Sequence, residues 1–273
     1  MTILVTGATG TLGRHVVERL RQAGQTVRAL TRTPAAATSL PDDVEVVGGD
    51  LTRPQTMAAA FDGVSAVHLL GATGHDHTPL RTGPQILGMA AEAGVQRLTV
   101  LSPGEEELGK AVRDSGMEWT FIWPIDLMSN ALGWAEVIRR TAEVREPYAN
   151  RRTASADEED VAAVAATVLA TGGYAGRSLT VSGPEALTPA DKVSAIAAAT
   201  GREIRFTELT DDQARQHWRA EGWPEEGIEF MLHMWATVPE TVAKVTSTVE
   251  EVVGRPPRTF AQWAAAHADA FRA

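Results

Sequence analysis

The residues with the clearest chemical potential are three glycines near the N-terminus, Gly7, Gly10 and Gly13, and the later Arg32. The glycines form a G-x-x-G-x-x-G pattern directly after a short apolar run at residues 3–5. Between a strand and a helix, glycines leave backbone N–H groups uncovered, and the helix N-terminus adds positive potential. Such a turn can be purely structural. Its place between a strand and an amphipathic helix favours a pyrophosphate-binding site of a dinucleotide.

Arg32 lies 19 positions after Gly13, at the expected end of the second strand. NAD-binding sites usually carry Asp or Glu at this point, which holds the ribose 2′-hydroxyl. A carboxylate would repel a 2′-phosphate, whereas a guanidinium can bind it through two charge-assisted hydrogen bonds. The sequence therefore predicts a preference for NADPH. The alternative is that Arg32 is a solvated side chain at a strand end.

Alternating strand and helix patterns in the first half of the chain are expected to position these residues. The expected strands are residues 3–5, 27–30, 44–47, 66–70, 98–101 and 120–123. Helices are expected between them, over residues 55–61, 84–93 and 105–114. Continuous apolar strands separated by helices are typical of a doubly wound parallel sheet. We therefore predict an α/β, Rossmann-type dinucleotide-binding domain at residues 1–125.

The second half is less regular and is predicted to form a smaller, substrate-binding lobe at residues 126–273, with residues 157–182 returning to the first domain. Helices are expected at 126–141, 160–170 and from 189 to about 201, and strands at 178–182 and 203–209. After residue 141 a long polar loop is expected, running through Pro147, Tyr148 and the Arg151-Arg152 pair. Thr188-Pro189 and the segment 210–213 have the sequence of helix N-caps.

Composition narrows the functional classes. The chain has 273 residues, a formal net charge of −10 and no cysteine, which excludes disulfides and thiolate chemistry. The acidic charge argues against a nucleic-acid partner, and no stretch reaches the 18 apolar residues typical of a membrane span. The first strand begins at residue 2 without a basic leader. We therefore expect a cytoplasmic protein with a small-molecule substrate and no membrane association.

Six motifs in order carry a resemblance to a known family. They are T-G-A-T-G-T-L-G at 6–13, L-T-R-T-P at 30–34, G-D-L-T at 49–52, L-S-P-G at 101–104, G-M-E-W-T-F-I-W-P at 116–124 and E-D-V-A-A-V-A at 159–165. With them, the chain resembles the NmrA-like group of atypical short-chain dehydrogenase/reductases. That group includes NAD(P)H-dependent quinone and dye reductases and NADP-sensing transcriptional regulators. The likeness is strong to about residue 185 and loose beyond it.

The resemblance implies NADP(H) as the cofactor and a set of contacts along it. The residues expected at the diphosphate belong to the glycine turn: Gly7, Thr9, Gly10, Thr11 and Leu12. The residues expected along the rest of the cofactor follow the later strands: Arg32 at the 2′-phosphate, Asp50 and Leu51 at the adenine, Leu70, Gly71 and Ala72 at the ribose, and Ser102 and Pro124 near the nicotinamide. All of them would share the carboxyl edge of the sheet.

The proton donor of the wider superfamily is missing from the sequence. That superfamily reduces carbonyls with a tyrosine and a lysine four residues later. Here Tyr148 is followed at that spacing by Arg152, and Tyr174 by Ser178. Without this pair, an epimerase of the extended branch is disfavoured, because it needs the pair to cycle protons.

Two interpretations remain. In the first, the protein is a reductase that transfers hydride from NADPH to an acceptor needing little acid assistance: a quinone, enone, dye or polycyclic ketone. In the second, it is a non-catalytic, NADP-sensing regulatory protein. We favour the enzyme, because the sequence shows no disordered tail or basic arm to suggest a protein partner.

Two candidate catalytic residues follow. Ser102 occupies the place at which the resemblance implies a serine bonding a substrate carbonyl or the nicotinamide. His75, beside His77, follows the fourth strand and could donate a proton near neutral pH, or it could lie in a solvated loop. No metal site is expected, because the H-x-H segment with Asp76 lacks further ligands.

Several later residues could contact a substrate. Asp126 and Asn130 follow the sixth strand, although Asp126 could instead cap a helix. Trp123 stands at the end of that strand and is a candidate for a pocket wall. The segment 231–235, which includes Trp235, could form a helix face that covers the pocket or could pack in the core.

Overall fold

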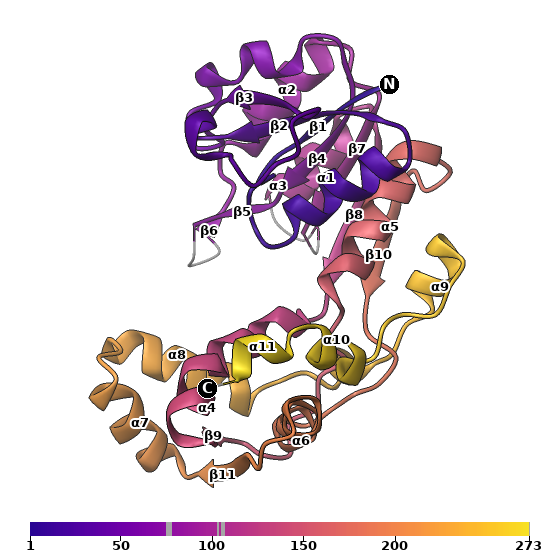
Figure 1. Ribbon diagram of the computed structural model, residues 1–273. Coiled ribbons are helices and arrows are strands. Elements are labelled where there is room, and N and C mark those ends of the chain that lie inside the picture. Colours follow the sequence, from indigo (N-terminus) through magenta and orange to yellow (C-terminus); the bar gives the residue numbers. More distant parts are fainter. Residues whose placement is uncertain (75–77, 103, 105–106, 273) are drawn as a thin grey trace. The chain divides into compact units, whose positions relative to one another are not determined.

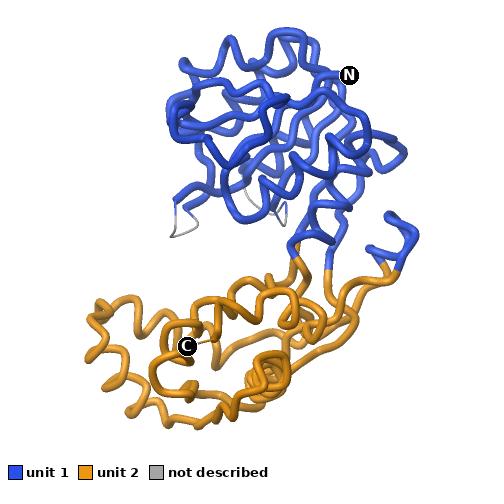
Figure 2. The backbone as a smooth tube through the Cα atoms, viewed as in Figure 1, with its two compact units in different colours: residues 1–123, 158–181, 248–255 blue, residues 124–157, 182–247, 256–273 orange. Residues whose placement is uncertain are grey.

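The computed structural model describes residues 1–74, 78–102, 104 and 107–272 (Figure 1). The chain divides into two compact units, shown in Figure 2. Unit 1 contains residues 1–123, 158–181 and 248–255, and unit 2 contains residues 124–157, 182–247 and 256–273. The chain therefore passes from one unit to the other five times.

Unit 1 is built on a seven-stranded parallel sheet. Its strands, in order across the sheet, are β10 (Arg177–Val181), β8 (Glu118–Pro124), β7 (Arg97–Leu101), β4 (Val64–Leu70), β1 (Thr2–Val5), β2 (Thr26–Thr31) and β3 (Glu45–Gly48). The order runs outward in both directions from β1 and β4, so these two strands form the switch point of the sheet. Ligands of such sheets bind outside the carboxyl ends of the strands at this point. The predicted α/β, Rossmann-type fold is confirmed.

Helices cover both faces of this sheet because the strands are apolar on both sides. Leu4, Val67 and Leu98 belong to one buried cluster with Ile86 of α2 (Gly83–Glu92) and Val112 of α3 (Glu107–Asp114). The helices α1 (Gly13–Gln22), α5 (Glu158–Thr171) and α9 (Thr248–Val253) pack side by side, α5 lying between the other two. Because α9 lies far along the chain, its place in unit 1 was not apparent in the sequence.

The expected helix at 55–61 is not an α-helix. The structure has two short 3-10 turns there, η2 (Pro54–Thr56) and η3 (Ala58–Phe61). The Thr56 hydroxyl donates to the carbonyl of Arg53 and accepts from the Asp50 N–H, at 2.7 and 2.9 Å. Such local side-chain bonds compete with the α-helical pattern. A further 3-10 turn, η1 (Pro34–Ala36), and a small hairpin, β5 (Ala72–Thr73) with β6 (Thr78–Pro79), complete unit 1.

Unit 2 is mainly helical around a two-stranded parallel ladder of β9 (Glu143–Pro147) and β11 (Arg205–Leu209). Its other elements are η4 (Met128–Trp134), α4 (Ala135–Thr141), α6 (Pro189–Thr200), α7 (Asp211–Ala220), α8 (Glu225–Ala236), η5 (Glu240–Ala243), α10 (Phe260–Ala266) and α11 (Ala268–Phe271). Strand β9 begins the segment expected to be a loop. The helix expected at 126–141 is a 3-10 turn followed by a short α-helix.

The N-cap predictions for unit 2 are confirmed. The Thr188 side chain accepts from the backbone of Asp191 at the start of α6, and Thr210 accepts from Gln213 at the start of α7. Each of these pairs is a complete capping box. Within the part of the chain that the structure describes, no helix has both the length and the apolar character to cross a membrane.

Candidate functional site

The glycine turn joins β1 to α1 in a conformation that other residues would disturb. Gly7 has a positive φ of 64°, which favours glycine. A Cβ added to Gly13 would lie 2.0 Å from the carbonyl oxygen of Gly7, which is a clash between backbone atoms. The residues between these glycines at positions 9–11 are exposed. The turn is therefore compact beneath and open above, as a cradle for a pyrophosphate requires.

The N-terminus of α1 is also suited to an anion. No side chain caps it, and its first turn contains no acidic residue. Leu12 at the N-cap is buried, so the chain enters the helix with its apolar side chain inward. The first N–H groups of a helix carry partial positive charge and need acceptors. A diphosphate would supply such acceptors here.

The turn is fixed to the sheet by Thr6. Its N–H and its hydroxyl both donate to the carbonyl of His68 at 3.0 Å, and the hydroxyl accepts from the N–H of Leu70 at 2.9 Å. These bonds continue the pairing of β1 with β4 beyond the last paired residues of the ladder. The start of the glycine turn is therefore held against the end of β4.

The sheet brings several predicted residues to one edge. Arg32 is exposed and follows β2, which neighbours β1. Gly71 follows β4, and a Cβ on it would lie 2.7 Å from both the Leu101 carbonyl oxygen and the Ser102 Cβ. Gly71 and Ser102 thus meet at the ends of β4 and β7. The parallel order of these strands places them on the same carboxyl edge as the glycine turn.

The other predicted cofactor residues occupy the same edge with different exposure. Leu70 and Ala72 are partly buried on either side of Gly71. Leu51 is buried, and its carbonyl accepts a hydrogen bond from the Thr82 hydroxyl at 2.5 Å. Pro124 ends β8 and is partly buried, and Trp123 before it is 43% exposed. Contact of these residues with a cofactor stays a prediction.

Asp50 has a local structural role that sequence reasoning did not find. Its carboxylate accepts hydrogen bonds from the hydroxyl and the N–H of Thr52 at 2.8 and 2.9 Å. It also accepts from the Arg53 guanidinium at 3.1 and 3.2 Å. The hydrogen bonds from Thr52 hold the pKa of Asp50 below its usual value, with a smaller contribution from Arg53. The carboxylate is therefore ionised and shapes the loop that follows β3.

Of the two candidate catalytic residues, one can be placed. Ser102 is partly buried, and its hydroxyl accepts from the N–H of Gly104 at 3.1 Å. Among the described residues its hydroxyl has no acceptor, so it can donate its proton to another group. His75 lies outside the described residues, as do His77 and Pro103. Within the described ranges, no group of three or more metal-ligating side chains comes together.

His68, inside β4, is a buried titratable residue that the sequence analysis did not single out. It is fully buried, and its Nδ1 lies 2.8 Å from the Thr99 hydroxyl. Its Nε2 has no hydrogen-bond partner among the described residues. Burial lowers the pKa of His68 to about 4. The imidazole is therefore neutral at physiological pH. His68 was not noticed in the sequence because it lies within the apolar run expected to form a strand at 66–70.

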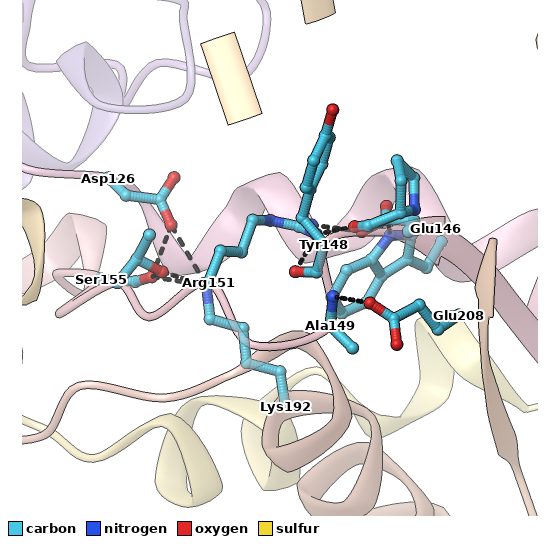
Figure 3. Close-up of polar contacts among 11 residues, drawn as sticks. Asp126, Glu146, Tyr148, Ala149, Arg151, Ser155, Lys192 and Glu208 are labelled. Carbon is cyan, nitrogen blue, oxygen red and sulfur yellow. Dashed lines mark hydrogen bonds and ion pairs between the residues drawn. The ribbon is translucent and has the colours of Figure 1, made fainter. Parts of the chain in front are cut away.

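Unit 2 contains a polar cluster around Asp126, shown in Figure 3. The Lys192 ammonium donates to the Ser155 hydroxyl at 2.7 Å, to the Thr153 hydroxyl at 2.9 Å and to the Asp126 carboxylate at 3.2 Å. Ser155 also donates to that carboxylate, and Asn130 donates to its other oxygen at 2.6 Å. Asp126 does not cap a helix, because the following 3-10 turn begins after Leu127 without a side-chain cap.

A second cluster in unit 2 is built around Arg151 (Figure 3). Its guanidinium forms an ion pair with Glu146, with both side chains only 12% exposed. It also donates to the Pro147 carbonyl at 2.7 Å and lies 4.0 Å from the ring centroid of Trp235. Tyr148, between these residues in sequence, has a positive φ of 58°, which is rare for an aromatic residue. Its hydroxyl donates to Asp211 at 3.0 Å.

Comparison with known proteins connects this arrangement to reductases. Residues 7–105 match a family model described as NAD(P)H-binding. The chain is 40% identical to a (4-alkanoyl-5-oxo-2,5-dihydrofuran-3-yl)methyl phosphate reductase of Streptomyces griseus, covering 98% of this chain and 99% of that protein. It is 36% identical to an NAD(P)H azoreductase of Xenophilus azovorans, covering 99% of each.

A solved structure shares the fold at lower sequence identity. A Citrobacter triphenylmethane reductase complexed with NADP(H) superimposes with a TM-score of 0.82 at 20% identity. The likeness covers 98% of this chain and all of that one. At this identity it shows a common architecture.

Proposed function

We propose that this chain, which belongs to the NmrA-like group of atypical short-chain dehydrogenase/reductases, transfers hydride from NADPH to a small conjugated acceptor. Membership rests on the NAD(P)H-binding match and on two reductases that are 40% and 36% identical over nearly their whole length. The chain is an NAD(P)H-dependent oxidoreductase, and the predicted NADP(H) cofactor class is confirmed. We further propose that the chain prefers NADPH, that its acceptor is conjugated, and that the cofactor residues lie in unit 1.

One observation carries the cofactor site: an open glycine turn and an uncapped helix N-terminus share the sheet edge with Arg32. The N–H groups of this turn and of α1 would hold the pyrophosphate. Arg32 would bind the 2′-phosphate, because its guanidinium is exposed at the end of the neighbouring strand. Leu70, Gly71 and Ala72 would line the ribose. When bound, NADPH supplies the hydride.

Two named relatives support the acceptor class. The Streptomyces griseus protein acts on an oxo-dihydrofuran phosphate, whose ring carries a carbon–carbon double bond in conjugation with a carbonyl. The Xenophilus azovorans protein is an azoreductase, so its acceptor contains a nitrogen–nitrogen double bond. Both acceptors contain an electron-poor π-system. We infer the same class for this chain: a quinone, an enone, an azo or related dye, or a polycyclic ketone.

Such an acceptor fits a site without the Tyr–Lys pair. The Tyr148 hydroxyl is bonded to Asp211 in unit 2, and Tyr174 lies in the segment before β10, where its carbonyl accepts from Thr120. A conjugated acceptor takes hydride at one atom and a proton at another, and delocalisation of the charge lets the proton come from water. Ser102 would orient the acceptor or the nicotinamide through its free proton.

A turnover assay tests this function. NADPH oxidation is followed by its loss of absorbance with menadione, an unsaturated lactone such as 2(5H)-furanone and an azo dye such as methyl red. We expect oxidation with at least one of them, at a lower KM for NADPH than for NADH. Tight NADPH binding with no oxidation by any acceptor would contradict the proposal and favour the NADP-sensing regulatory alternative.

A further inference from the structure

Unit 2 contains a pocket that is lined by its own residues alone. Its volume of about 620 Å³ lies in the range of small-molecule sites. All of the lining residues belong to unit 2, and those that carry the argument are Tyr148, Arg151, Arg152, Glu208, Trp235 and Glu240. They combine two aromatic rings with charged groups, a mixture that is typical of small-molecule sites.

The aromatic wall of this pocket is held rigid. One contact on Trp235 comes from the Arg151 guanidinium at 4.0 Å, and Trp218 packs edge-on against the same ring at 5.5 Å. Tyr148 is tied through its hydroxyl to Asp211 and through its carbonyl to the N–H of Arg151 at 3.1 Å. Its left-handed backbone is unfavourable for an aromatic residue, and these contacts hold it in place. Both rings are thus preorganised.

The two arginines of the pocket differ in the contacts that they already make. Arg151 is engaged by the partly buried Glu146, by backbone carbonyls and by the Trp235 ring, so it acts as a structural support. The Arg152 side chain is 58% exposed, donates to the Ala186 carbonyl at 3.1 Å and lies 3.9 Å from Asp191. That carboxylate is already bonded to the N-cap of α6 at 2.9 Å. The guanidinium of Arg152 can therefore take a further anionic partner.

The two acidic residues of the pocket lining, Glu208 and Glu240, have different surroundings. Glu208 accepts the N–H of Ala149 at 2.9 Å, which fixes it to the loop that follows β9. Glu240 stands at the start of η5 and is exposed. A ligand with an anionic group at the Arg152 end and an uncharged ring over Tyr148 and Trp235 matches this distribution.

We propose that the unit 2 pocket binds a planar, conjugated small molecule that carries an anionic group, with its ring against Tyr148 and Trp235 and its anion on Arg152. The inference concerns unit 2 by itself and does not depend on the proposed hydride transfer. The anion is a phosphate, carboxylate or sulfonate.

Calorimetric titration of the full-length protein without NADPH tests the pocket. The probe is anthraquinone-2-sulfonate, and its uncharged counterpart is anthraquinone-2-sulfonamide. For the wild-type protein we expect one site and a Kd at least about tenfold lower for the sulfonate, as a charge-assisted hydrogen bond gives. Arg152→Gln should bring the two Kd values together, and Arg152→Lys should restore part of the difference.

Arg145→Gln is the matched control, because Arg145 is an exposed arginine of β9 outside the pocket lining. It should keep the wild-type preference for the sulfonate, and each variant should keep the wild-type NADPH affinity as a check on folding. An unchanged preference in Arg152→Gln, an equal loss in both variants, or no binding of either probe would overturn the inference.

The two proposals fail separately. Probe binding that depends on Arg152, without NADPH oxidation by any acceptor, would contradict the hydride transfer and leave the pocket as a binding site. NADPH oxidation by a protein that binds neither probe would contradict the pocket and leave the reductase function.

Discussion

At the scale of single residues, the sequence predicted the glycine turn after β1 but not the polar clusters of unit 2. Gly7 and Gly13 stand out in sequence because a turn of fixed geometry needs them, and the structure shows the close approach that explains it. Lys192 and Ser155 did not stand out, because their meeting depends on how loop 151–157 and α6 pack together. Residues that meet only in the folded structure and lie far apart in the sequence do not form a motif with a recognisable spacing.

Gly13→Ala tests the close approach at the cradle. The added Cβ would meet the backbone of Gly7 at 2.0 Å, so the turn must shift. Overpacking of this kind costs about 1–3 kcal/mol of unfolding free energy, and NADPH affinity should fall with it. The control is Gly88→Ala in α2, where a Cβ meets nothing within 4 Å. That variant should gain about 0.5–1 kcal/mol in denaturant unfolding; equal losses in both variants would contradict the account.

His68 predicts a pH dependence of stability. Its pKa is about 4 in the folded protein, against an ordinary histidine value of 6.5, so the unfolded chain binds more protons between these limits. The free energy of unfolding should therefore fall as pH falls from 6.5 through 4, by about 3 kcal/mol at 1.36 kcal/mol per pKa unit. In His68→Leu this component is absent. Urea unfolding of both proteins across this range is the measurement, and parallel pH curves would contradict the prediction.

At the scale of elements, periodic patterns were predictive and weak patterns were not. The inner strands of the sheet, such as β1 and β4, are mainly apolar because both of their faces are covered, and they were found from the sequence. Strand β9 was missed, because only Val144 and Pro147 of its residues are buried and the remainder are charged. The 3-10 turns at 54–61 resembled a helix in sequence, since both have apolar residues on one side.

The capping boxes give a prediction at this scale. Thr188→Ala removes the side chain that accepts from the Asp191 N–H at 3.1 Å and should cost about 1 kcal/mol of unfolding free energy. Ser194→Ala, at an exposed position within the same helix, should cost nothing, because alanine has the higher helix propensity. Thermal unfolding of the two variants compares them. An equal effect of both would show that the cap does not stabilise α6.

At the scale of the whole molecule, the chain returns to unit 1 twice, at 158–181 and at 248–255. The first return was expected, because the sequence indicated a strand at 178–182 that rejoins the sheet. The second was not, because α9 is six residues long and its partners lie about 70–90 residues earlier. Its contacts with unit 1 include the Thr248 hydroxyl, which donates to the Thr180 carbonyl at 2.7 Å.

An ion pair anchors this second return. Arg255 lies 2.6 Å from the carboxylate of Asp160, whose side chain is fully buried in α5. Arg255→Ala should lower the unfolding free energy by about 3 kcal/mol, because it leaves a buried charge with one cation fewer. Arg272→Ala is the control, since the Arg272–Asp269 pair is exposed and should contribute less than about 1 kcal/mol. Equal destabilisation in urea unfolding would contradict the anchoring role.

The central claim is that an open glycine turn and Arg32 form an NADPH site. Calorimetric titration of NADPH and NADH into the wild-type protein and Arg32→Ala tests it most directly, with Arg177→Ala, an exposed arginine at the start of β10, as the control. We predict tighter NADPH than NADH binding in the wild type and the control, and a loss of about 1.5–3 kcal/mol for NADPH alone in Arg32→Ala. Equal affinities of all three proteins for NADPH, or no heat with either cofactor, would contradict the account.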